Sequence, residues 1–215
     1  PSVDLSRERL PESDVLESRG LTCTAPLRTA FDGSRLAPCL VEAVVHLDML
    51  LTCGLVIRAE LQTYIAEHPG WRGIQQARDA LALAEQGSRS PPETRLRLIW
   101  VLDAGLPPLL VNRAVFDLRG RLLGYPDALD VDSGTVLEYD GDDHRELLAH
   151  TQDNAREETF EDHGLIVSRA TRLDMRGDRG RLVARMRAAR ARGLRRDRSL
   201  DRWTLQPPPG WCEPR

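Results

Sequence analysis

Lysine is absent from this sequence, and all 30 of its basic side chains are arginines. A mechanism that needs a catalytic amine is therefore excluded, including Schiff-base chemistry and a phosphate-binding lysine of the Walker type. Codon usage in a GC-rich genome is a sufficient cause of this composition. The chemical exclusion holds whatever the cause.

Cysteine is sparse, and long apolar runs are missing. The four cysteines form no CxxC pair, so neither a zinc knuckle nor a disulfide scaffold is indicated, and we expect a reducing compartment. No run approaches the roughly 18–20 apolar residues that cross a bilayer. Residues 1–5 lack the basic-then-apolar layout of a secretion signal. These absences together predict a cytoplasmic protein.

The 215 residues, 41% of them hydrophobic, are enough for a proper core and exclude wholesale disorder. Apolar side chains at helical spacing predict helices at about 37–52, 58–67 and 73–84, which suggests a small helical subdomain. We expect four segments in all. They are an amino-terminal segment without clear periodicity at 1–35, the helical subdomain at 36–87, an α/β domain at 88–193 and an Arg/Pro-rich tail at 194–215, which we expect to lie on the surface or to be mobile.

The pattern changes at Ser88. Ser90, Pro91 and Glu93 have the spacing of a capping box with proline at the first helical position, and an apolar run follows to Ala104. Strand-like and helix-like segments then alternate, which predicts an α/β (α+β) domain with a mixed sheet flanked by helices. The expected strands are 110–118, 122–125, 135–139 and 165–168, and the expected helices are about 145–162 and 180–192.

Charge is segregated within this second half. Seven acids and no arginine occur between Asp127 and Asp143, whereas thirteen arginines and four acids occur between Leu165 and Arg202. A total charge of −3 therefore conceals an acidic centre and a basic flank. This layout is suited to a metal ion beside a polyanion.

Glu138 and Asp140 are two residues apart in an expected strand, so their side chains share one face about 7 Å apart. At an effective dielectric constant of about 20, two carboxylates at that distance repel by on the order of 2 kcal/mol. A hard cation such as Mg²⁺ turns this cost into coordination. Asp127, in the turn before the strand, is the next candidate ligand. Glu93 is explained by its helix cap and is also a candidate fourth oxygen.

An ordered set of residues resembles a known family. Pro126-Asp127, the run Glu138 to Gly141 and His144, followed by Asp153, Arg156 and the strand that ends in Arg169, resemble the nuclease core of the PD-(D/E)XK superfamily. They are similar in particular to its branch related to very-short-patch-repair (Vsr-like) endonucleases. The resemblance covers residues 88–193 and implies a restriction-endonuclease-like fold. The helical stretch before it resembles part of proteins with an AbiEi-type antitoxin amino-terminal region.

The resemblance implies a site in which Mg²⁺ or Mn²⁺ is held by Asp127 and Glu138, with Glu93 as an auxiliary group. It implies that Arg156 and Arg169, together with Arg172, bind phosphates of DNA. The superfamily usually places lysine two residues after the acid, where this chain has Asp140. Either His144 positions or deprotonates the attacking water instead, or catalysis has been lost.

Two functional hypotheses follow. The first is a Mg²⁺-dependent DNA endonuclease with catalytic residues Asp127, Glu138, Asp140, His144 and Glu93. The second is a non-catalytic module that binds nucleic acid or a partner protein, such as the regulatory half of a toxin–antitoxin-like pair. The missing lysine, the helical amino-terminal half and the basic flank favour the second hypothesis. Cleavage that requires a metal ion separates the two.

Overall fold

The structure is a computed structural model and describes residues 8, 10–141 and 158–212. The chain forms two compact units, Pro1–Gln86 and Gly87–Arg215. Each unit has its own buried core, and each is described here by itself. Within the described residues, no helix is both long enough and apolar enough to cross a bilayer.

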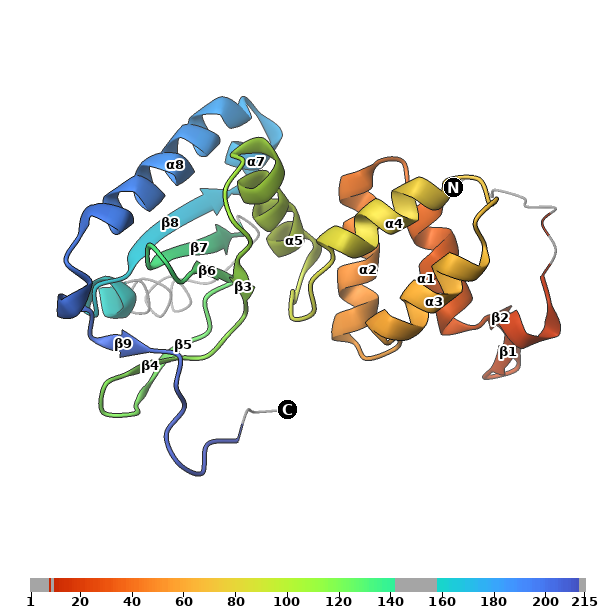
Figure 1. Ribbon diagram of the computed structural model, residues 1–215, viewed down its shortest axis with the longest axis horizontal. Helices are drawn as coiled ribbons and strands as arrows, with labels where there is room; N and C mark the ends of the chain where they lie inside the picture. The colour runs from red at the N-terminus through yellow and green to blue at the C-terminus, as the bar shows by residue number, and fades with distance from the viewer. Residues whose placement is uncertain (1–7, 9, 142–157, 213–215) are drawn as a thin grey trace. The chain divides into compact units, whose positions relative to one another are not determined.

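The first unit is mainly helical and begins with an antiparallel hairpin. Its elements are β1 (Val15–Ser18), β2 (Leu21–Thr24), α1 (Pro26–Arg35), α2 (Leu40–Thr52), α3 (Arg58–Glu67) and α4 (Ile74–Leu83), after a short 3-10 turn at Glu12–Asp14 (Figure 1). The three helices expected from the apolar spacing are present as α2, α3 and α4. Residues 1–35, in which the sequence shows no clear periodicity, contain β1, β2 and α1.

Apolar periodicity did not predict helix α1, because part of the face that it buries is charged. Arg28 and Arg35 are both only 3% exposed. Arg28 contacts Asp14 at 3.2 Å and Asp32 at 2.6 Å, and Arg35 is paired with Glu8. Paired ions of this kind can occupy interior positions that a hydrophobicity pattern assigns to solvent.

The second unit is an α+β fold built on two sheets, which confirms the expected fold class. The larger sheet has the strand order β3-β6-β7-β8, in which β7 and β8 are parallel and the other neighbours are antiparallel. It is therefore mixed, as expected. The smaller sheet, β5-β4-β9, is antiparallel. The strands are β3 (Leu110–Val111), β4 (Val115–Asp117), β5 (Leu122–Gly124), β6 (Ala128–Asp130), β7 (Thr135–Asp140), β8 (Ile166–Thr171) and β9 (Trp203–Thr204).

Helices cover the larger sheet (Figure 1). They are α5 (Pro91–Leu98), which continues as a π-helical turn over Ile99–Asp103, then α7 (Arg172–Arg176) and α8 (Arg179–Arg195). A 3-10 turn, Arg198–Leu200, precedes β9. Of the helix expected at 145–162, only residues 158–162 are described, and these are helical.

Strand β7 lies between two parts of the core, and its side chains alternate between them. Leu137 packs with Trp100 and Met186 on the face covered by α5 and α8. Val136 packs with Phe160 and Trp203 on the opposite face. Because strand side chains alternate, Glu138 and Asp140 lie on the Val136 face.

Two strand expectations need correction. The single strand expected at 110–118 is divided into β3 and β4, because Asn112 adopts a left-handed backbone with φ +46°. The tail does not lie wholly on the surface, since β9 pairs with β4 and Trp203 is only 8% exposed. The pairing of β4 with a strand so far along the chain leaves no local sequence signal.

Candidate functional site

Three strands of the larger sheet bring the candidate residues into one row. The antiparallel register of β6 and β7 pairs Ala128 with Leu137, so that Asp127 takes the next position, opposite Glu138. The parallel register of β7 and β8 places Arg169 opposite Glu138 on the other side. The two acids that the sequence singled out are therefore neighbours across strands, on one face of the sheet.

A hollow of about 380 Å³ opens at this row. Four of the five residues expected to be catalytic line it, and so does one of the arginines expected to bind phosphate. The lining residues are Arg89, Ser90, Pro92, Glu93, Asp127, Glu138, Tyr139, Asp140, Gly141 and Arg169. Below, we call this hollow the acidic pocket.

Asp127 and Glu138 both lie at the wall of the pocket. The backbone N–H of Tyr139 donates a hydrogen bond of 2.8 Å to Oδ2 of Asp127, which fixes that carboxylate against the end of β7. Glu138 is only 7% exposed, because the strand beneath it is buried. Burial of this kind strengthens every electrostatic interaction of the carboxylate.

Asp140 lies farther toward solvent and faces a guanidinium. Its Oδ2 is 3.7 Å from Nη1 of Arg169, and both side chains are about 30% exposed. A cation from β8 thus approaches the position at which the resembled superfamily carries a lysine. The acidic pocket therefore contains charges of both signs.

Glu93 has a clear structural role. Its carboxylate accepts hydrogen bonds from the Ser90 hydroxyl at 2.9 Å and from the Arg89 backbone N–H at 2.8 Å. The Ser90 hydroxyl in turn accepts from the Glu93 backbone N–H at 3.4 Å. The expected helix cap at Ser90 is therefore present, but the Glu93 carboxylate accepts from the backbone N–H of Arg89, the residue before the cap. This contact fixes Glu93 beside the pocket.

Asn112 ties two of these acids together and was missed by the sequence argument. Its side-chain amide donates to Oε2 of Glu93 at 2.9 Å and to the carbonyl of Gly87 at 2.9 Å. Its backbone N–H donates to the carbonyl of Asp127 at 3.2 Å. The only local signal is the residue type, since asparagine tolerates a left-handed backbone better than most residues do. The partners are distant in the sequence.

The remaining candidates lie elsewhere. His144 and Arg156 fall outside the described residues. Arg172 is the first residue of α7, immediately after β8, and is not among the residues that line the pocket. Arg89 was not predicted, although it lines the pocket and its guanidinium lies 5.2 Å from the ring of Tyr125.

The pocket offers carboxylate oxygens as the possible ligands of a metal ion. Within residues 8, 10–141 and 158–212, no group of three or more His, Cys, Asp or Glu side chains is arranged as a metal site. Mg²⁺ is commonly bound by one or two carboxylates and keeps several waters. Asp127 and Glu138, opposite each other beside a hollow of about 380 Å³, fit that smaller requirement.

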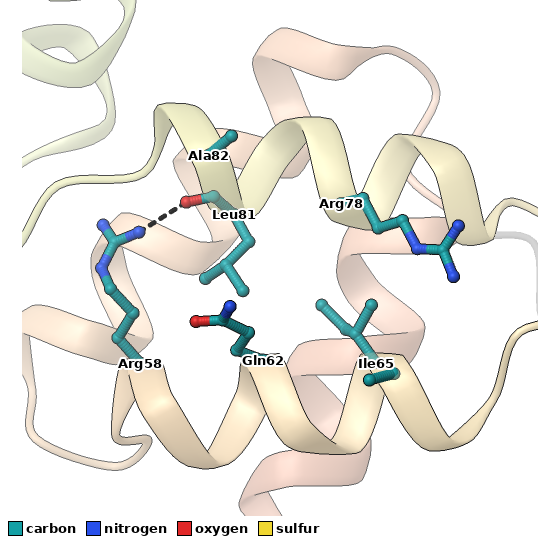
Figure 2. A pocket seen from close by; sticks show the side chains of 7 residues that line it. Arg58, Gln62, Ile65, Arg78, Leu81 and Ala82 are labelled. Carbon is teal, nitrogen blue, oxygen red and sulfur yellow. Dashed lines mark hydrogen bonds between the residues drawn. The ribbon is translucent and has the colours of Figure 1, made fainter.

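The first unit has a hollow of its own, of about 370 Å³, between α3 and α4. Figure 2 shows Arg58 at one end and Arg78 at the other, with Gln62, Ile65 and Leu81 between them. The guanidinium of Arg58 donates to the carbonyl of Leu81 at 2.6 Å, so it caps the end of α4. Among the described residues, arginine, glutamine and apolar side chains line this hollow.

Comparison with known proteins finds two similar chains. Uncharacterised proteins of two Mycobacterium tuberculosis strains, CDC 1551 and H37Rv, are each 28% identical over 190 residues, which is 86% of this chain and 68% of theirs. No family model matches the sequence, and no solved structure matches it. The relatives thus share most of the length of this chain, and both are themselves uncharacterised.

Proposed function

We propose that this protein is a metal-dependent nuclease that hydrolyses phosphodiester bonds of DNA. The observation that carries the proposal is the meeting of Asp127 and Glu138 across two strands, beside a pocket that also contains Arg169. The antiparallel pairing of β6 with β7, two strands joined by the turn at 131–134, brings the two carboxylates together. The resemblance to PD-(D/E)XK nucleases rests on the same residues.

Each residue has a role in this proposal. Asp127 and Glu138 would hold Mg²⁺ or Mn²⁺, and the Tyr139 N–H keeps the Asp127 carboxylate in position. A bound ion would supply Lewis-acid polarisation of the scissile phosphate and would lower the pKa of a water at the site. The guanidinium of Arg169, which is always positively charged, would contact a phosphate oxygen. His144 stays the expected proton acceptor.

Purified protein incubated with supercoiled plasmid and Mg²⁺ or Mn²⁺ tests the proposal. We expect nicking or linearisation, which falls at least about 100-fold in Asp127→Asn and in Glu138→Gln, because each removes a charge that balances the ion. Asp132→Asn is the matched control, since Asp132 is an exposed acid of the same segment and does not line the pocket. Equal cutting by all variants, or no cutting with either metal, rejects the nuclease.

A second candidate function is supported by the pairing of Asp140 with Arg169. This pair neutralises charge where the resembled enzymes present a lysine, as expected of a binding module that has lost catalysis, such as an antitoxin-like regulator. Such a module binds nucleic acid or a partner protein equally well in EDTA. Calorimetric titration of wild type and Glu138→Gln with Mg²⁺ separates the candidates. A nuclease should bind Mg²⁺ as wild type and lose the heat of binding in the variant, whereas the binding module should show no such difference.

A further inference from the structure

Helix α8 is unusually basic for a helix that packs on a sheet. Its residues Arg179–Arg195 include seven arginines and no acid. Leu182, Met186 and Ala189 are buried against the larger sheet and account for one face of the helix. The arginines occupy the rest of its circumference and fall into two groups.

The first group has structural partners. Arg179 pairs with Asp103 at 3.2 Å. Arg190 pairs with the buried Asp130 at 2.9 Å. Arg187 donates to a backbone carbonyl at the end of the π-helical turn. These three contacts attach α8 to the rest of the unit, so their presence needs no ligand.

The second group forms an exposed stripe. At about 100° per residue, Arg181, Arg185 and Arg192 fall within roughly 40° of one another, and Arg195 lies next to them. We call these four residues the arginine ridge. All four are exposed, and the exposed residues between them on that side, Ala184 and Ala188, are small.

Within the part of the chain that the structure describes, the ridge has little counter-charge. The side chains of Arg181, Arg192 and Arg195 make no hydrogen bond or ion pair with any described residue. Arg185 alone is paired, with Asp174 at 3.2 Å. Like charges three and four residues apart disfavour a helix, so the ridge has an electrostatic cost that packing does not explain.

One end of the ridge meets the strand that leads into the acidic pocket. Nη2 of Arg185 donates to the carbonyl of Arg169 at 2.8 Å, and Arg169 lines that pocket. Strand β8 is the outer strand of the larger sheet in its described part, and α8 lies against it (Figure 1). Through this contact the ridge is joined to the strand that contributes Arg169 to the pocket.

We propose that the arginine ridge binds the sugar–phosphate backbone of DNA, independently of base sequence. The inference rests on the proposed function, since the ridge positions DNA for the acidic pocket. From Arg181 to Arg195 the helix rises about 21 Å, which equals the axial length of roughly six base pairs. Guanidinium groups recognise phosphate oxygens with paired N–H donors, and the alanines between them let the backbone approach closely.

The test is the salt dependence of DNA binding, measured without metal ions. Fluorescence anisotropy of a labelled duplex of about 20 base pairs is recorded in EDTA between about 50 and 200 mM salt. The ridge variant is Arg181→Ala/Arg192→Ala. The matched control is Arg78→Ala/Arg119→Ala, which removes the same charge from exposed positions elsewhere.

The logarithm of the association constant falls linearly with the logarithm of salt concentration. We expect this dependence to be less steep in the ridge variant by about 2, at roughly 0.9 per lost phosphate contact. The control should keep the wild-type slope. Arg181→Lys/Arg192→Lys should keep it too, and circular dichroism should show the same helix content in every variant. Because alanine favours helix, the ridge variant should fold.

Equal slopes for the ridge and control variants overturn the proposal. The proposal is also overturned if the ridge variant loses as much affinity for polyglutamate as it loses for DNA. The ridge would then be a general surface for acidic protein. Neither outcome bears on plasmid cutting, which tests the acidic pocket separately. If the protein binds DNA through the ridge and does not cut it, the ridge proposal stands and the nuclease proposal is rejected.

Discussion

At the scale of single residues, Asn112 connects the most distant parts of the candidate site. It joins the carboxylate of Glu93 to the segment that carries Asp127, and its backbone is left-handed. The position therefore combines two requirements, a tolerant backbone and a donor amide. Substitutions at this residue can separate them.

Asn112→Ala is expected to destabilise the protein by about 2–4 kcal/mol, because it removes the amide donors and imposes strain at φ +46°. Asn112→Gly loses the same donors without the strain, so its cost should be smaller by about 1 kcal/mol. Urea unfolding followed by circular dichroism measures both. Equal stabilities of the two variants would show that backbone strain contributes nothing.

Tyr64 gives a pH-dependent signature in the first unit. Burial, followed by its hydrogen bond of 2.6 Å to Asp14, raises the pKa of Tyr64 to about 12. The folded pKa lies above the ordinary value of about 10, so this contribution to stability is complete below pH 10. It is lost as the pH rises toward 12.

The measurement is a titration of phenolate absorbance in wild type and in Tyr64→Phe. We expect the difference between the two curves to show one group titrating near pH 12. The stability difference between the proteins should shrink over the same range. A missing transition near pH 10 in the variant would mean that Tyr64 is an ordinary exposed tyrosine.

At the scale of elements, α8 depends on a glycine for its approach to the sheet. A Cβ built on Gly193 would lie 2.1 Å from the carbonyl oxygen of Ser133, which is backbone and cannot move aside cheaply. The close approach lets the last turn of α8 pack over the turn between β6 and β7. The helix propensity of glycine is poor, so packing decides its presence here.

Gly193→Ala is therefore expected to destabilise the protein by about 1–3 kcal/mol, although alanine favours helix. Gly70→Ala is the control, because a Cβ there meets nothing within 4 Å. Thermal unfolding of both variants decides the matter. A Gly193→Ala protein as stable as wild type would contradict the described packing.

The elements also show which features the sequence predicts. Strand β7 and helix α3 were predicted closely, because apolar side chains and turn residues near their ends are local signals. Strand β6 was missed because it has three residues and ends in Asp130. Its identity as a strand comes from pairing with β7, which periodicity does not reveal.

The candidate site divides in the same way. Asp127 and Glu138 were predicted as partners, because an acid in a buried strand needs a compensating charge. Asn112 and Arg89 were not, since their roles depend on contacts with residues brought near by folding. The sequence thus predicts the acids that line the pocket, and tertiary contacts determine which residues hold them in place.

At the scale of the whole molecule, each unit has its own core. Phe31, Leu47 and Leu61 are fully buried in the first unit, and Trp100 and Leu137 are fully buried in the second. A core of this kind allows independent folding in units of this size.

We expect 1–86 and 87–215, expressed separately, each to unfold cooperatively in urea and to keep its secondary structure. The second polypeptide should retain any metal binding of the acidic pocket, because all the lining residues belong to it. Circular dichroism and calorimetry provide the readouts. Loss of cooperative unfolding in either piece would show that it needs the other.

The pairing of β4 with β9 has a consequence for biosynthesis. Asp117 lies opposite Trp203, so during translation β4 must wait for 86 further residues before its neighbour exists. At about 5–20 residues per second, the delay is roughly 4–17 seconds. During this delay the nascent polypeptide lacks β9, so Val115 and Phe116 of β4 are not yet covered by it. That interval is when we expect chaperones to engage the growing chain.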